Sequence, residues 1–148
     1  MSKEFKGRVV VPGRARAEAL VTHKGFNTLA SFQMAIMFNK KGVPCGDQNN
    51  EDIYGLPMQD KALCLPITIG STTGGMILYT VLAEGKAPAC MLFSEPIDSL
   101  AASGAIMGSV WTDSVMPVVD SLGEEFLNTV KTGDKIEIRD DGVVVIAD

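Results

Sequence analysis

Short apolar runs alternate along this chain with polar segments rich in glycine and proline, which predicts strands and helices joined by turns. We interpret residues 23–31 as a loop because they contain Gly25 and Asn27. The apolar run 32–38 does not distinguish a helix from a strand by its pattern. The other short apolar runs predict strands at residues 5–11, 17–22, 61–69, 88–94, 115–119 and 143–146.

Two longer segments in the middle of the chain predict helices. Residues 76–84 are apolar on nearly every face, which is typical of a buried helix that Gly85 would end. A second helix is expected to start around Pro96, since proline is tolerated in the first turn. One face of that helix would carry residues spaced at helical intervals, namely Ile97, Leu100, Ala101, Gly104 and Ala105.

The C-terminal part of the chain predicts one more helix and a hairpin. Ser121 to Glu124 has the pattern of a capping box, and the helix it would open ends near Gly133. A stripe of Leu122, Phe126 and Val130 lies along this helix. Asp141-Gly142 is a tight-turn signal before the last strand, so the chain is expected to end in a β-hairpin.

This order of elements predicts an α/β fold with mixed sheets, packed helices and a C-terminal β-hairpin. A length of 148 residues indicates a single domain spanning 1–148. Residues 39–60 form a long polar segment without a strand or helix pattern. Such a segment in a compact domain is more often functional than not, and it could be a lid, a docking loop or part of a site.

Composition and charge exclude several classes of protein. With 46% hydrophobic residues the chain is globular, and its net charge of −5 argues against nucleic-acid binding. No apolar run reaches membrane-spanning length and the start does not resemble a signal peptide, so we expect a cytoplasmic protein. His23 is the only histidine, and we interpret it as a polar loop or surface residue.

The three cysteines suggest neither a disulfide framework nor a metal site, because no two of them lie within four residues of each other. Cys45, Cys64 and Cys90 are therefore interpreted as two buried thiols and one loop thiol, and no metal ligand is expected in this chain.

The segment Gly70-Ser71-Thr72-Thr73-Gly74-Gly75, between a predicted strand and a predicted helix, has the features of an anion site. The N-terminus of a helix presents unpaired N–H groups and partial positive charge. The alternative is structural, in which a hydroxyl caps the helix and the glycines form the turn. A P-loop is disfavoured because Met76 stands where that motif needs lysine. The Gly-x-Ser-x-Gly pattern of hydrolases is also absent.

Several segments, read in order, resemble the small subunit, or swivel domain, of the aconitase X family. They cover nearly the whole chain and comprise Gly7-Arg8, Gly13-Arg14, 19–22, 47–55, Leu65-Pro66, 70–75, 85–89, Glu95-Pro96, 117–119, 132–134 and 142–144.

The resemblance implies a dehydratase that pairs this chain with a large catalytic subunit, which holds an iron–sulfur cluster or iron centre. It implies that Ser71 is the catalytic base, and that Gly70, Thr72, Thr73 and Gly74 bind the substrate. Such a serine must act as an alkoxide, stabilised by positive charge and N–H donors, while a metal accepts the leaving hydroxide.

The substrate that we expect is a small hydroxy acid such as 3-hydroxyproline. The alternatives are phosphomevalonate, or a non-catalytic metabolite-binding or assembly domain that kept the fold. Two departures from the family pattern affect this expectation. Ile69 stands where relatives often have arginine, and the segment 47–55 lacks the histidines that relatives often carry.

Overall fold

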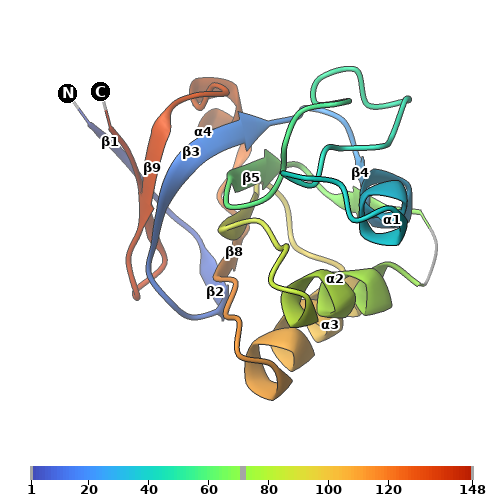
Figure 1. Cartoon of the computed structure of the whole chain (residues 1–148). Coiled ribbons are helices and arrows are strands. Elements are labelled where there is room, and N and C mark those ends of the chain that lie inside the picture. The colour runs from blue at the N-terminus through green and yellow to red at the C-terminus, as the bar shows by residue number, and fades with distance from the viewer. Residues whose placement is uncertain (1, 71–72, 148) are drawn as a thin grey trace.

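The computed structural model describes residues 2–70 and 73–147, which form one large sheet with four helices packed on it (Figure 1). The helices are Thr28–Met37 (α1), Gly74–Ala83 (α2), Ser99–Trp111 (α3) and Glu124–Thr129 (α4). The strands are Lys3–Lys6 (β1), Arg8–Val11 (β2), Ala15–Val21 (β3), Phe26–Asn27 (β4), Ala62–Leu65 (β5), Thr68–Ile69 (β6), Cys90–Phe93 (β7), Val118–Asp120 (β8), Lys135–Ile138 (β9) and Val143–Ile146 (β10).

The large sheet has the strand order β1-β10-β9-β3-β5-β7-β8-β2 and is parallel at its centre. Strands β3, β5, β7 and β8 run parallel, while β2, β9, β10 and β1 pair antiparallel. Every residue of β5 and β7 is buried, as expected for parallel strands covered on both faces. The predicted α/β fold with mixed sheets and a C-terminal hairpin, here β9–β10, is confirmed.

Alternate residues of the central strands enter two separate hydrophobic cores, because successive side chains of a strand point to opposite faces. Leu63 and Leu65 of β5 enter the core beneath α1, α2 and α3. Ala62 and Cys64 enter the core beneath α4. This core also contains the buried apolar side chains of the β9–β10 hairpin. In Figure 1, β1 and β9 lie at one side of the molecule, and α1, α2 and α3 gather at the other.

The prediction of one continuous strand over residues 5–11 is wrong. Gly7 separates two strands, which lie at opposite edges of the sheet. Strand β1 pairs with β10, whereas β2 pairs with β8. A Cβ atom on Gly7 would lie 2.3 Å from the backbone oxygen of Asp120, so only glycine allows this crossing. The strand predicted at 61–69 is likewise divided, and β6 joins β4 in a second sheet of two strands.

The predicted loop 23–31 is also wrong, because α1 begins inside it. The side chain of Asn27 accepts a hydrogen bond from the backbone N–H of Ala30, at 3.0 Å, and so caps the helix. The residue that we interpreted as a loop former is therefore a helix cap. The ambiguous run 32–38 continues this helix as far as Met37.

The ends and faces of the other helices differ in part from their predictions. Pro96 lies before α3, which Asp98 caps, and Leu100 is half-exposed. Helix α2 ends before Gly85 as predicted, but Met76 on its outer face is 72% exposed, so the helix is only partly buried. The capping box at Ser121 is absent, since Gly123 precedes α4, and this helix ends at Thr129 rather than near Gly133.

The long polar segment 39–60 is packed into the protein as an integral part of the fold. Four of its apolar residues, Val43, Cys45, Ile53 and Met58, are buried in the core beneath α1 to α3. Polar contacts fasten it as well, since Asp52 accepts hydrogen bonds from the backbone of His23 and from the hydroxyl of Thr22. These two hydrogen bonds outweigh partial burial and lower the pKa of Asp52.

Asp120 links the sheet edge to the segment that leads into α3. Its carboxylate is fully buried and accepts two hydrogen bonds from Arg8, at 2.9 and 2.6 Å, and one from the backbone of Ile97, at 2.7 Å. Burial opposes the charged form, but these hydrogen bonds and the Arg8 charge lower the pKa of Asp120 overall. The carboxylate is therefore kept ionised as the connection between β2, β8 and α3.

We expect Asp120→Asn to lower the free energy of unfolding at pH 7 by about 1–2 kcal/mol, since the Arg8 side chain is 63% exposed and stays solvated. Because the pKa of Asp120 is lower in the folded state, its stabilisation is complete above the unfolded pKa of about 4 and is lost as the pH falls through the folded value. Urea unfolding should therefore show the wild type and the variant converging in acid. Asp140→Asn, at an exposed pair with Arg14, is the control and should change stability by less than about 0.5 kcal/mol.

Candidate functional site

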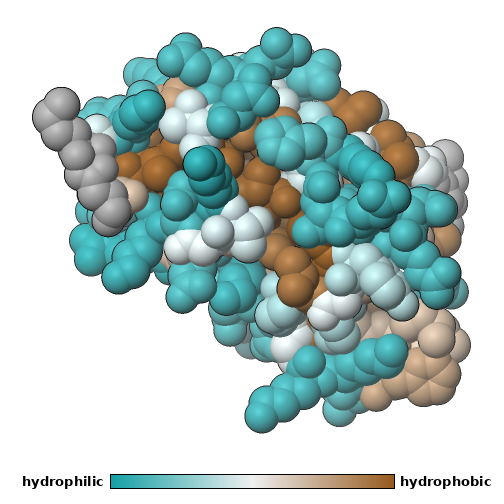
Figure 2. Space-filling view, turned by 90° about the horizontal axis from the view of Figure 1, so that it is seen from above, coloured by the Kyte–Doolittle hydropathy of each residue, from teal (hydrophilic) through white to brown (hydrophobic). Residues whose placement is uncertain are grey.

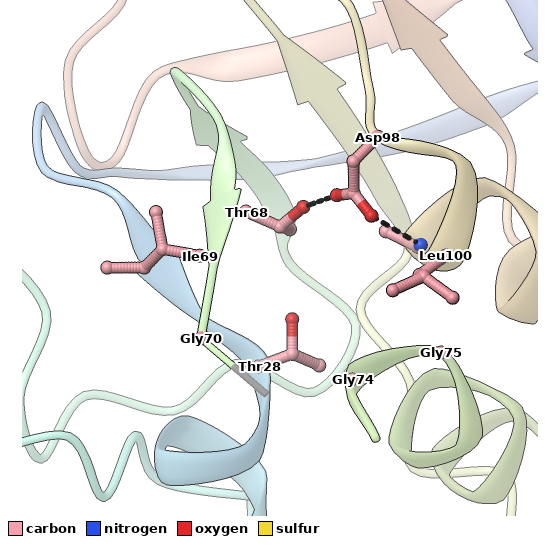
Figure 3. A pocket seen from close by; sticks show the side chains of 9 residues that line it. Thr28, Thr68, Ile69, Gly70, Gly74, Gly75, Asp98 and Leu100 are labelled. Atoms are coloured by element: carbon pink, nitrogen blue, oxygen red, sulfur yellow. Dashed lines mark hydrogen bonds between the residues drawn. The ribbon is translucent and has the colours of Figure 1, made fainter. Parts of the chain in front are cut away.

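A surface pocket of about 240 Å³ lies where the N-termini of three helices meet (Figure 3). The end of β6 forms one wall, and the first residues of α1, α2 and α3 form the others. The lining residues are Thr28, Thr68, Ile69, Gly70, Gly74, Gly75, Asp98, Leu100 and Ala101. Three aligned sets of backbone dipoles thus direct their positive ends toward one cavity, which favours an anion there.

The short parallel pair β4–β6 brings the start of α1 to the pocket. Phe26 pairs with Thr68 and Asn27 pairs with Ile69, so the chain enters α1 beside Gly70. Gly70 has a φ of +104°, and a Cβ atom there would lie 2.9 Å from the Asn27 side chain. Glycine at position 70 is therefore needed both for the backbone conformation and for the close contact with the cap of α1.

The three helix N-termini are capped differently. Asn27 caps α1, and Asp98 caps α3 by accepting a hydrogen bond from the backbone N–H of Ala101 at 2.9 Å. The second carboxylate oxygen of Asp98 accepts a hydrogen bond from the Thr68 hydroxyl, as Figure 3 shows. Thr73 precedes α2 but makes no capping hydrogen bond with its side chain. Of the three residues that precede these helices, Thr73 is thus the one whose side chain does not cap its helix.

Two glycines allow α2 and α3 to approach closely at the pocket. A Cβ atom on Gly75 would lie 2.4 Å from the backbone oxygen of Leu100. A Cβ atom on Gly104 would lie 2.1 Å from the backbone oxygen of Gly75. Because each glycine faces backbone rather than a flexible side chain, this contact fixes how far apart the two helix N-termini stand.

The charged side chain at the pocket is a carboxylate. Among residues 2–70 and 73–147, no lysine or arginine lines the cavity, and Asp98 is the one acidic residue there. Lys61 lies 3.5 Å from Glu18, and Lys86 contacts Asn39, so both nearby lysines in the sequence are engaged elsewhere. Ile69 also lines the pocket, and its side chain points away from Asp98 in Figure 3.

The structure places two of the predicted site residues in the pocket, namely Gly70 and Gly74. Thr73 directly precedes α2 but is not among the residues that line the pocket, while Ser71 and Thr72 lie outside the described residues. Sequence reasoning missed Thr28, Thr68 and Asp98. Asp98 carried a recognisable signal, since an aspartate before an apolar helical run is a common cap. Thr28 was hidden by the interpretation of 23–31 as a loop.

The described residues do not fit a metal centre. No three histidine, cysteine, aspartate or glutamate side chains gather in residues 2–70 and 73–147 in a way that could hold an ion. All three cysteines are free and buried, Cys45 within the loop segment, so the predicted loop thiol is not exposed. Burial raises the pKa of Cys64 well above its usual range and that of Cys90 to about 12. Both groups are therefore protonated thiols at neutral pH.

Comparison with known proteins identifies the fold and the family. The family described as aconitase X swivel domain matches residues 4–146. The phosphomevalonate dehydratase small subunit of Thermococcus onnurineus is 27% identical over 144 residues, which cover 97% of this chain and 98% of the relative. The protein of the same name from Methanocella arvoryzae is 29% identical over 137 residues, covering 91% and 92%.

A solved structure agrees with this match. The crystal structure of Thermococcus kodakaraensis aconitase X in its holo-form shares 28% identity with this chain. The two superpose with a TM-score of 0.82 over 99% of each chain. None of the helices in the described part of the chain is long and apolar enough to cross a membrane. Since the family match spans nearly the whole chain and a solved structure shares its fold, this protein belongs to the aconitase X swivel domain family.

Proposed function

We propose that this chain is the small subunit of a two-subunit dehydratase, a hydro-lyase that is active only with its large subunit, and that phosphomevalonate is its substrate. The observation that carries the proposal is the pocket at the three helix N-termini, which is suited to an anionic ligand. Relatives named phosphomevalonate dehydratase small subunit match over 98% and 92% of their lengths, which supports this substrate over 3-hydroxyproline.

In this proposal, the residues of segment 70–74 have two roles in the dehydration, which are proton removal and substrate binding. Ser71, which follows the pocket residue Gly70, removes the proton from carbon as an alkoxide. The positive end of α2 stabilises that charge. Thr72, Thr73 and the backbone N–H groups of Gly70 and Gly74 hold the carboxylate or phosphate oxygens. The assignment of Ser71 is supported by the family resemblance and by the positions of its described neighbours.

The metal centre belongs to the partner in this proposal. Because the side chains described here do not fit a metal, we assign the iron–sulfur cluster or iron centre to the large subunit. The free cysteines agree with a cytoplasmic enzyme, and the net charge of −5 agrees with a partner other than nucleic acid.

One observation favours a second candidate substrate, an unphosphorylated hydroxy acid such as 3-hydroxyproline. Phosphate groups are usually held by arginine or lysine, and within residues 2–70 and 73–147 neither lines the pocket. Asp98 would further oppose a doubly charged phosphate. For phosphomevalonate to bind, the large subunit must therefore supply the cations.

Reconstitution with the large subunit of the same organism, under anaerobic conditions, tests the proposal. Phosphomevalonate and 3-hydroxyproline are offered in parallel, and the dehydrated product is followed by mass spectrometry. We expect turnover of phosphomevalonate by the complex and none by either subunit alone. Turnover of 3-hydroxyproline only would establish the second candidate. Ligand binding by the isolated chain, with no large subunit bound and no turnover, would establish a non-catalytic binding domain instead.

We expect Thr73→Val to raise the KM of the complex about tenfold, because the variant loses one hydrogen bond to a substrate oxygen. The control is Thr73→Ser, which keeps the hydroxyl and should restore KM to within about twofold. Steady-state kinetics on both complexes provide the measurement. If KM is unchanged in the valine variant, the Thr73 hydroxyl does not bind substrate and serves the structure of the α2 N-terminus.

A further inference from the structure

Helices α2 and α3 present an apolar surface to solvent that the fold itself does not use. Neither helix contains a single charged residue, although charged residues make up 21% of the chain. A groove of about 350 Å³ runs between them. We call this surface the α2–α3 face and define it by five of the exposed large side chains on the two helices, which are Met76, Leu100, Met107, Val110 and Trp111.

The α2–α3 face is unusual for a solvent-exposed helix pair. Met76, Val110 and Trp111 are each more than 70% exposed, at 72%, 71% and 75%. Helices at a protein surface normally carry polar residues on the side that faces water. The face seen in Figure 2, from the top of Figure 1, is mainly hydrophilic, whereas α2 and α3 lie at the bottom of Figure 1.

The α2–α3 groove is continuous with the candidate active site. Gly75 and Leu100 line both the groove and the pocket at the helix N-termini. A molecule that lies in the groove therefore reaches the rim of the pocket. Because the groove and the pocket are continuous, the partner that binds in the groove is expected both to cover the groove and to complete the site.

We propose that the α2–α3 face is the docking surface for the large catalytic subunit, an inference that rests on the function proposed above. The large subunit has to bring the metal and the cations that the described pocket lacks, so it must contact this chain beside the pocket. A second copy of this chain would bring no metal site among its described residues. A stable interface buries about 800 Å² of each partner, more than the groove alone offers, so the contact extends along α3 to Val110 and Trp111.

Single substitutions of exposed residues test this proposal without disturbing the fold. We expect Met107→Glu and Met76→Glu to weaken binding of the purified large subunit at least about tenfold, because each places a charge in an apolar interface. Met37→Glu is the matched control, since Met37 is a methionine on α1 that is 65% exposed and outside the α2–α3 face. It should leave Kd within about twofold of wild type. Isothermal titration calorimetry gives Kd, and thermal melting checks that all three variants are folded.

The outcomes separate this proposal from the one on which it rests. If the wild-type chain binds the large subunit and both glutamate variants bind equally well, the α2–α3 face is not the docking surface, while the dehydratase assignment stands. If the wild-type chain does not bind the large subunit at all, both proposals are wrong. If sedimentation shows that the wild-type chain self-associates and Met107→Glu abolishes only this association, the occupant is a second copy, which also overturns the proposal.

Discussion

Replacing Ser71 with alanine should lower kcat of the reconstituted enzyme by about 10²–10⁴-fold, which is the usual contribution of a positioned general base. Serine is a weak base at its ordinary pKa, so its role depends on an environment that stabilises the alkoxide. The N-terminus of α2 lies at the pocket that Gly70 lines, and the partial positive charge of its helix dipole provides part of that environment. Steady-state kinetics of the complex are the direct measurement.

Controls separate a chemical role of Ser71 from a structural one. Ser114→Ala removes a hydroxyl from a serine that does not line the pocket, and it should keep kcat within about twofold of wild type. The Kd between Ser71→Ala and the large subunit should equal that of wild type, because the change removes one hydroxyl and no apolar surface. A Ser71→Ala complex that retains the wild-type kcat would refute the assignment of the base and leave Ser71 as a helix cap.

Gly104→Ala should destabilise the protein by about 3 kcal/mol, the upper part of the range for overpacked sites. The added methyl group would lie 2.1 Å from the backbone oxygen of Gly75, and neither backbone can move without separating α2 from α3. Alanine gains about 1 kcal/mol in helix propensity over glycine, which is too little to offset this clash. Urea unfolding measures the loss, and catalysis should fall as well, because two walls of the pocket move apart.

Ser103→Ala is the matched control for Gly104→Ala. Ser103 is the neighbouring residue on α3 and is exposed, with its hydroxyl bonded to the backbone oxygen of Ser99. Its replacement should change the free energy of unfolding by less than about 0.5 kcal/mol. Equal stability of Gly104→Ala and wild type would show that α2 and α3 separate at little cost, and that the close contact does not set the pocket geometry.

The sequence by itself determined the elements whose signals lie within a few residues. The buried central strands β5 and β7 follow from uninterrupted apolar runs, and the hairpin follows from Asp141-Gly142. A helix at the end of the glycine-rich segment was also predictable from its apolar run, although α2 begins at Gly74, two residues before the predicted start. The family was recognisable from ordered segments along the chain, and the comparison confirms it.

Only the tertiary structure decided how these elements assemble into a site. Thr28, Gly74 and Asp98 lie far apart in the sequence, and no local pattern reports that three helices begin at one cavity. Their meeting depends on the pairing of β4 with β6 and on the backbone contact between Gly75 and Gly104. The division of residues 5–11 between two sheet edges is likewise a tertiary effect, because β1 pairs with β10 and β2 pairs with β8. Periodicity and capping act over one or two turns, whereas strand pairing and helix packing join residues that only the folded chain brings together.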